Sequence, residues 1–113
     1  MIEKTLRRYL EHALPDPVFL EKLPGAPERR YILEKTGGDV ADHIWSAVIA
    51  VQSCAPSLLE AAEMSSAAVA AMLAAPSPQR RISGVKLNAE YNFTDTSVKG
   101  YRYQAVFDIY YKE

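Results

Sequence analysis

Cysteine and histidine are scarce in this chain of 113 residues, which has one cysteine and two histidines. The single Cys54 cannot form an internal disulfide, so the sequence excludes a disulfide-stapled secreted domain and is compatible with a reducing cytosol. His12 and His43 stand far apart, and no cluster of histidine and cysteine has the spacing of metal ligands. The glycine motifs that bind dinucleotides or phosphates are also missing. We therefore expect neither a metal nor a cofactor.

The chain also has almost no net charge and no long apolar run. The net charge is −1, which gives no electrostatic reason to expect binding to nucleic acid or to a membrane surface. The longest apolar-rich stretch, residues 58–75, is rich in alanine and contains two glutamates and two serines, too polar for a membrane span. The first residues are charged and amphipathic, unlike a signal peptide. We expect a soluble, intracellular protein without membrane or sequence-specific nucleic-acid partners.

The first half of the chain predicts one helix followed by strands, within a single domain of residues 1–113. Apolar residues at three- and four-residue steps in residues 2–13 indicate an amphipathic helix, which the prolines of 14–17 end. Residues 18–23 and 31–36 are typical of short strands, and we expect Gly37–Gly38 to break the second. Residues 43–55 predict the longest strand. Its two faces are both apolar, which is typical of a central strand or of one that packs on another subunit.

The second half predicts a helix and a hairpin. Ser57 with Glu60 three residues later forms a capping-box pattern, so we expect a helix from there to about Ala75. Residues 85–93 and 101–111 alternate apolar and polar side chains, which predicts a long antiparallel hairpin. We expect its five tyrosines to pack mainly in the sheet core or at the sheet edge. The whole pattern predicts an α+β fold of order α-β-β-β-α-β-β, a small mixed or antiparallel sheet of about five strands packed with two helices.

Catalytic candidates are weak. Asp42, His43 and Ser46 are close in the sequence, but neighbouring residues of an extended segment point to opposite faces, and no nucleophile motif surrounds the serine. Cys54 lies in an apolar strand end and is expected to be a small buried hydrophobe. Three arginine pairs, at 7–8, 29–30 and 80–81, are each too short for a nucleic-acid patch, although the fold could bring them together. We expect no catalytic residue and no enzymatic activity.

Several segments together point to a known family. The ordered patterns are YILEKTGG, then AVIAVQSCAPSLLEAAEMSSAAVAAM, then LNAEYNFTD and YRYQAVFDIYY, which span roughly residues 18–112. In that order they resemble the small tail-terminator and tail-completion proteins of long-tailed bacteriophages and prophages. The resemblance implies helices packed on a small sheet, and a structural role in the neck or tail of the virion. It carries no catalytic motif.

The resemblance also implies partners. Such proteins form rings, commonly hexamers, at the head-proximal end of the tail tube, where they stop tube growth and offer a surface to the head connector. The chain would then lie in the virion, after assembly in the host cytoplasm. Three loops are our candidates for contacts with neighbouring rings, and a solvated turn is the alternative for each. They are residues 23–30 with Arg29 and Arg30, residues 36–42 with Thr36, Gly37, Gly38 and Asp39, and residues 94–100 with Asp95 and Lys99.

Two alternatives stay open at the level of sequence. One is another connector of the same virion neck, such as a head-completion protein. The other is a small hydrolase or ligand-binding module built on His43, Asp42 and the tyrosine-rich hairpin.

Overall fold

The computed structural model describes all residues, 1–113, and contains two helices and five strands. These elements are α1 (Ile2–Ala13), β1 (Val18–Phe19), β2 (Arg30–Ala41), β3 (Ile44–Ala55), α2 (Leu58–Ala74), β4 (Ile82–Asn92) and β5 (Tyr101–Tyr111). The predicted α+β class and the predicted order of elements are confirmed.

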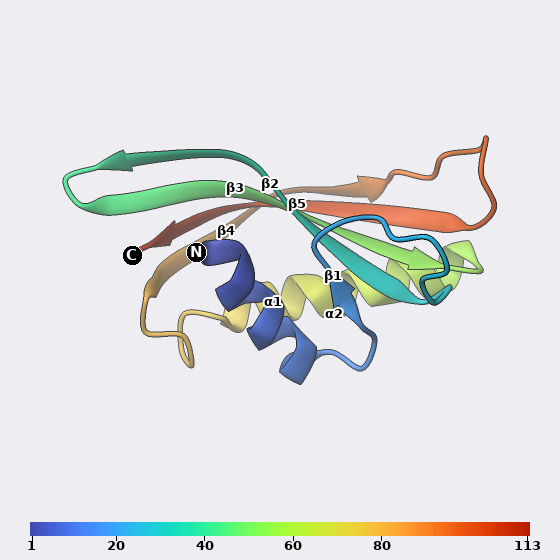
Figure 1. The fold of residues 1–113 in the computed structure, drawn as a ribbon, viewed down its shortest axis with the longest axis horizontal. Helices are drawn as coiled ribbons and strands as arrows, with labels where there is room; N and C mark the ends of the chain where they lie inside the picture. The colour runs from blue at the N-terminus through green and yellow to red at the C-terminus, as the bar shows by residue number, and fades with distance from the viewer.

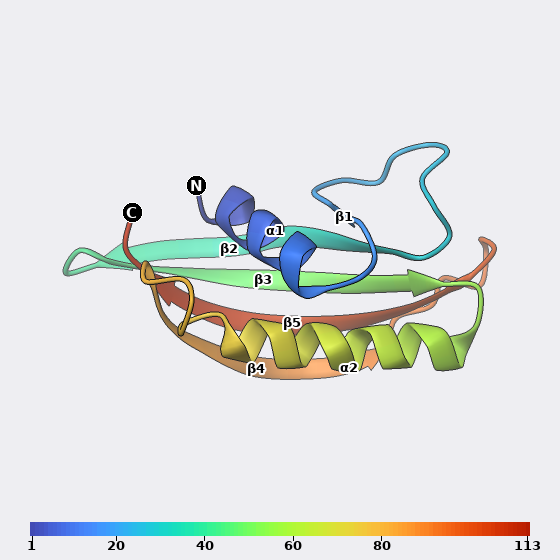
Figure 2. The ribbon, with the colours of Figure 1, turned by 90° about the horizontal axis from the view of Figure 1, so that it is seen from below.

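The five strands form one mixed sheet in the order β1-β2-β3-β5-β4. The short β1 runs parallel to β2, and every other neighbouring pair is antiparallel. Both helices lie on the same face of this sheet (Figure 2). Helix α2 packs on β3, β5 and β4, while α1 contacts α2, β1 and β2. The opposite face of the sheet has no helix over it, and we call it the open face.

The core lies between the helices and the sheet. Helix α1 buries the predicted apolar stripe of Ile2, Leu6 and Leu10. Two tyrosine hydroxyls form hydrogen bonds to the backbone of α2. Tyr9 donates a hydrogen bond of 2.7 Å to the carbonyl of Ala71, and Tyr31 donates one of 3.1 Å to the carbonyl of Met64. Because a buried hydroxyl needs a partner, both bonds fix the position of α2.

The predicted start and end of α2 are confirmed. Ser57 is the N-cap, and its Oγ accepts a hydrogen bond of 3.2 Å from the amide of Glu60. The same hydroxyl donates to Glu60 Oε2 at 2.8 Å. The helix ends at Ala74, next to the proline-containing turn that the sequence places there.

Two predicted boundaries in the first half were wrong. The strand expected over 18–23 has only the two residues of β1. The glycine pair does not break β2, because Gly37 pairs with Val48 and Gly38 with Ala47 of β3. Instead the register shifts between Lys35 and Gly37, which leaves Thr36 as a β-bulge. Backbone pairing to a full-length neighbour outweighs the weak strand preference of glycine.

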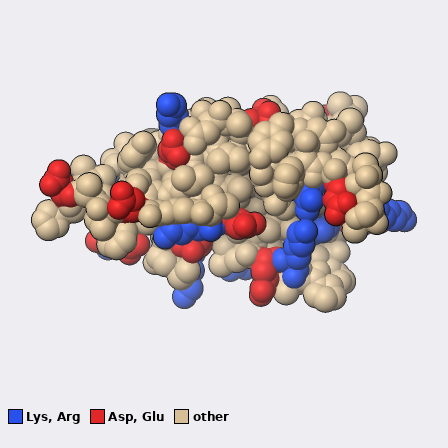
Figure 3. Space-filling view, turned by 90° about the horizontal axis from the view of Figure 1, so that it is seen from above, with Lys and Arg blue, Asp and Glu red and all other residues tan.

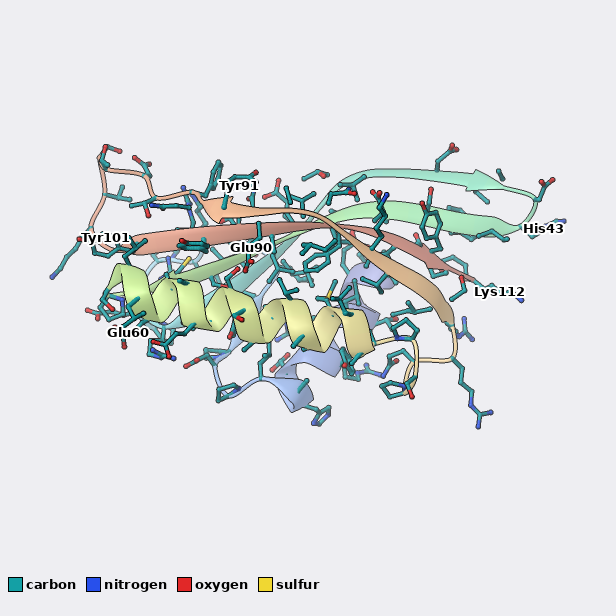
Figure 4. The ribbon with its side chains drawn as sticks, turned by 180° about the vertical axis from the view of Figure 1, so that it is seen from behind. His43, Glu60, Glu90, Tyr91, Tyr101 and Lys112 are labelled. Atoms are coloured by element: carbon teal, nitrogen blue, oxygen red, sulfur yellow. The ribbon has the colours of Figure 1, made fainter.

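The closing hairpin is confirmed, but a bulge changes one of its faces. The register of β4 shifts between Leu87 and Ala89. Leu87 therefore pairs with the buried Phe107 on the helix-covered face, whereas Tyr91 pairs with Gln104 on the open face. Glu90 comes to lie between β4 and α2, and accepts a hydrogen bond of 2.6 Å from Ser65 Oγ (Figure 4).

The tyrosines of this hairpin divide accordingly. Tyr111 is buried, and Tyr103 packs partly buried against the core. Tyr91, Tyr101 and Tyr110 are each about two-fifths exposed, at 39%, 43% and 43%. Core packing therefore explains part of the tyrosine content, and the other rings lie at the surface.

The molecule is elongated, with extents of 44 × 25 × 23 Å. The β2–β3 hairpin extends past the helices at one end of the long axis (Figure 1). The loop between β4 and β5, the end of β3 and the start of α2 lie at the other end (Figure 1). The two ends therefore offer different surfaces.

Candidate partner-binding site

Predicted contact residues that are distant in the sequence meet in a pocket of about 180 Å³ at the end of the molecule away from the β2–β3 hairpin. Its walls come from the β1–β2 loop, the end of β3 and the β4–β5 loop. The lining residues are Glu28, Arg30, Cys54, Ala55, Pro56, Asp95, Val98, Lys99, Gly100, Tyr101 and Arg102. Three predicted residues from two of the predicted loops, Arg30, Asp95 and Lys99, thus meet here. We call this the end pocket.

Strand register explains why cations gather in the end pocket. Arg30 of β2 and Arg102 of β5 both pair with Cys54 of β3, so the two guanidinium groups flank one thiol. Arg30 Nη1 donates to the carbonyl of Pro27 at 3.1 Å. Arg102 Nε donates to the carbonyl of Phe93 at 3.1 Å, and its guanidinium carbon lies 4.9 Å from the centre of the Phe93 ring. Neither arginine forms a salt bridge in the subunit.

Two carboxylates belong to the same pocket. Asp95 is turned toward its own loop, where Oδ1 accepts hydrogen bonds of 2.9 Å from the amide and 2.6 Å from the hydroxyl of Ser97. These bonds from Ser97, with a smaller contribution from Arg102, hold the pKa of Asp95 below its usual value. Glu28, from the β1–β2 loop, also lines the pocket. With Lys99 added to the two arginines, cations still outnumber carboxylates in the lining.

The thiol of Cys54 is buried, as the sequence predicts. Burial raises the pKa of Cys54, while Arg30, Arg102 and Lys22 act in the opposite direction. Burial is the larger effect, so the thiol is protonated at neutral pH and is a poor nucleophile. Of these cations, Arg30 and Arg102 line the end pocket next to the thiol and make the potential there more positive.

Arg29 has another role. Its Nη1 lies 2.9 Å from Glu60 Oε1, and its Nη2 lies 3.3 Å from Asp16 Oδ2. The hydrogen bond to Asp16 is the main reason that its pKa is raised. Arg29 therefore joins the segment after α1, the β1–β2 loop and the start of α2. Arg29, which was predicted to contact a partner, binds two carboxylates of its own subunit.

The second predicted contact segment is not a loop. Thr36, Gly37, Gly38 and Asp39 all belong to β2, and the chain reverses only at Asp42–His43. Both turn residues have positive φ angles, of 51° and 66°, as a two-residue type I′ hairpin turn requires. Of the predicted four, only Asp39 lies near this turn.

Apolar side chains gather around the turn. We call residues 39–45 the hairpin tip. Val40 is 46% exposed, and Ile44 is 47% exposed. Trp45 stacks on Tyr111 with ring centres 6.3 Å apart, and it remains partly exposed. Asp39 and Asp42 flank these residues without a salt bridge in the subunit. Lys112 and Glu113 lie next to the turn, in the shallow hollow that His43 shares.

The geometry does not assemble the catalytic candidates. Asp42 and His43 are exposed turn residues, while Ser46 lies further along β3 and does not line the hollow that contains them. Among the described residues, which are the whole chain, no group of three or more histidine, cysteine, aspartate or glutamate side chains could hold a metal ion. Neither helix has the length and apolar character to cross a bilayer.

The arginine pairs meet only in part. Arg8 and Arg81 line one hollow between α1 and the segment after α2, together with His12. Arg30 belongs to the end pocket instead. The three pairs therefore do not form one basic patch.

Sequence reasoning missed a polar row on the open face. Gln52 Nε2 donates to Gln104 Oε1 at 3.0 Å, and Gln104 Nε2 donates to the hydroxyl of Tyr91 at 2.6 Å. Gln52 Oε1 is buried without a partner. The middle of this face is mostly uncharged, and charged side chains lie around it (Figure 3). The sequence does contain one signal of this row, which is Gln52 within the apolar segment that forms β3. A buried glutamine must find a hydrogen-bonding neighbour, and in a sheet that neighbour lies on an adjacent strand.

Comparison of the chain with protein-family models and with curated proteins found no match.

Proposed function

We propose that this protein is a structural subunit that assembles into a ring, and that the ring is the tail terminator of a long-tailed phage or prophage. The observation that carries ring assembly is the uncovered hairpin tip. The β2–β3 hairpin extends past both helices (Figure 1), and its Val40, Ile44 and Trp45 remain 46%, 47% and 36% exposed. Apolar side chains that cluster at the end of a projecting hairpin are typical of an interface.

The shape supports a ring rather than a two-fold dimer. One end of the 44 Å axis carries the hairpin tip and the other carries the end pocket. Different surfaces at opposite ends favour head-to-tail contacts, which close into a ring when the rotation between subunits allows. Six copies placed end to end along the 44 Å axis would each form one side of a hexagon, and opposite subunits would then lie about 76 Å apart, roughly 1.7 times the side.

The placement in a phage tail comes from the sequence resemblance. In that setting the ring would end the tail tube and present a surface to the head connector. The open face, with its hydrogen-bonded row of Gln52, Gln104 and Tyr91, offers each subunit a further surface for such a neighbour.

Two measurements test this proposal. Light scattering over a concentration series reports the mass of the assembly, and electron microscopy of negatively stained particles reports its symmetry. We expect a closed ring, alone or on added tail-tube protein. A strict monomer that also fails to bind tail-tube protein would contradict the proposal. If the ring forms but gold labelling places it on the head side of the neck, the protein is a head-completion protein.

A further inference from the structure

The hairpin tip and the end pocket are complementary in charge. The tip carries Asp39 and Asp42, and no cation of the same subunit pairs with either in a salt bridge. Lys112 and Glu113 lie in the hollow beside Asp42, and Lys35 lines the hollow that contains Asp39, so carboxylates outnumber cations around the tip. The end pocket carries Arg30, Lys99 and Arg102, also without salt bridges. Glu28 and Asp95 reduce the positive charge of the pocket, but Ser97 already binds the carboxylate of Asp95.

The two surfaces also match in apolar character. The tip exposes Val40, Ile44 and Trp45. At the pocket rim, Val98 is 61% exposed and Tyr101 is 43% exposed. These two sets lie at opposite ends of the long axis, as the labels of His43 and Tyr101 show in Figure 4. They cannot meet within one subunit, but they can meet between two.

Other contacts between copies are less favourable. A two-fold contact of tip with tip would bring four carboxylates together, and juxtaposed like charges oppose association. Pairing through the free edge of β4 would meet bulges on both sides of Val85, one near Ser83 and one near Asn88. Bulges and edge charges such as Lys86 are features that prevent strands from pairing edge to edge. The free edge of β2 is interrupted in the same way at Thr36.

We propose that the hairpin tip of one copy docks on the end pocket of the next copy. Asp39 and Asp42 then face Arg30, Lys99 and Arg102, and the apolar residues of the tip cover Val98 and Tyr101. We call this contact between tip and pocket the joint. It specifies how neighbouring subunits of the proposed ring meet, and it rests on that proposal. Each subunit uses its tip once and its pocket once, so the same contact repeats around the ring.

Charge reversal tests the joint. Asp39 and Lys99 are both exposed, so Asp39→Lys and Lys99→Glu should leave the subunit folded, which circular dichroism checks. Each variant alone places like charges at every joint, and we expect assembly to weaken by about tenfold or more. Matched controls reverse one charge elsewhere, Glu63→Lys on α2 and Lys86→Glu on β4, and should assemble as the wild type does.

Mixing the two variants tests directly whether the two surfaces bind each other. In a mixture, the reversed tip of Asp39→Lys can bind the reversed pocket of Lys99→Glu, and the two unchanged surfaces can bind each other. We expect rings of alternating subunits from two preparations that fail separately, and we expect the double variant to assemble alone. Trp45, the single tryptophan, lies on the tip and should report each assembly by a blue shift of its fluorescence.

The outcomes separate the two proposals. If the wild type forms rings and neither reversal weakens them, the joint is wrong while the ring stands. If both reversals weaken the rings but neither the mixture nor the double variant recovers, the two surfaces do not face each other, and the joint is again wrong. A wild-type protein that is monomeric alone and with tail-tube protein overturns both.

Discussion

Ser57 and Glu60 hold each other at the first turn of α2. The amide of Glu60 donates to Ser57 Oγ at 3.2 Å, and that hydroxyl donates to Glu60 Oε2 at 2.8 Å. The other oxygen of Glu60 binds Arg29 at 2.9 Å. One carboxylate thus joins the start of the helix to the β1–β2 loop, which forms a wall of the end pocket.

Ser57→Ala should lower the free energy of unfolding by about 1 kcal/mol, because the substitution removes the N-cap of α2. Urea unfolding followed by circular dichroism measures the change. Ser66→Ala is the matched control, since Ser66 lies exposed in the same helix and alanine favours the helical interior. Equal effects of the two substitutions would show that the cap is not important.

Burial raises the pKa of Tyr31 to about 12, with a further contribution from Asp16. The neutral phenol also donates its hydrogen bond to Met64, which a phenolate cannot do. The folded state therefore binds the proton more tightly than the unfolded chain. The stability that this provides is complete below about pH 10, the usual tyrosine pKa, and is lost as the pH rises through about 12.

We expect the free energy of unfolding to fall by on the order of 2 kcal/mol across that range of pH. Tyr31→Phe should make the fall smaller, although some remains because burial also raises the pKa of Tyr9 and Tyr111. Tyr110→Phe, at an exposed ring, should leave it unchanged. Urea unfolding at a series of alkaline pH values checks this, and identical curves for the two variants would refute it.

His43 occupies the second position of the hairpin turn at a φ of 66°, in the left-handed region that glycine adopts without strain. His43→Gly should therefore stabilise the protein by about 0.5–1 kcal/mol, whereas His43→Ala should give no gain. Thermal unfolding compares the two variants with the wild type. The same variants, assayed on a panel of esters and phosphate esters, test the hydrolase alternative, because a turnover lost with His43 would support catalysis.

Most element boundaries were predictable because local signals coincide with the tertiary structure. The apolar steps of α1, the serine cap of α2 and the period-two pattern of β5 each match the surface that the element buries. The glycine pair in β2 and the bulge near Asn88 were not predictable, since both depend on register with a neighbouring strand. A shift of one residue there decides which face Tyr91 and Glu90 occupy.

The candidate site was predictable only in pieces. The sequence placed Arg30, Asp95 and Lys99 in two loops, and pairing of β2 and β5 with β3 is what brings those loops together. Arg29 and Arg30 look equivalent in the sequence, yet one binds Asp16 and Glu60 while the other lines the pocket. Which of two adjacent residues faces a partner depends on strand direction and on the position of α2, which no local pattern contains.

Cys54 should react slowly with a thiol reagent in the folded protein. Burial raises its pKa, and the reactive thiolate is then scarce near neutral pH even though Arg30 and Arg102 flank it. We expect dithiobis(nitrobenzoate) to react about a hundredfold more slowly without urea than in urea, because the thiol must first become exposed. A cysteine introduced as Ser66→Cys in a Cys54→Ala background lies at the surface and should react at the same rate in both conditions. Fast reaction of native Cys54 would mean that the positive potential of the end pocket outweighs burial.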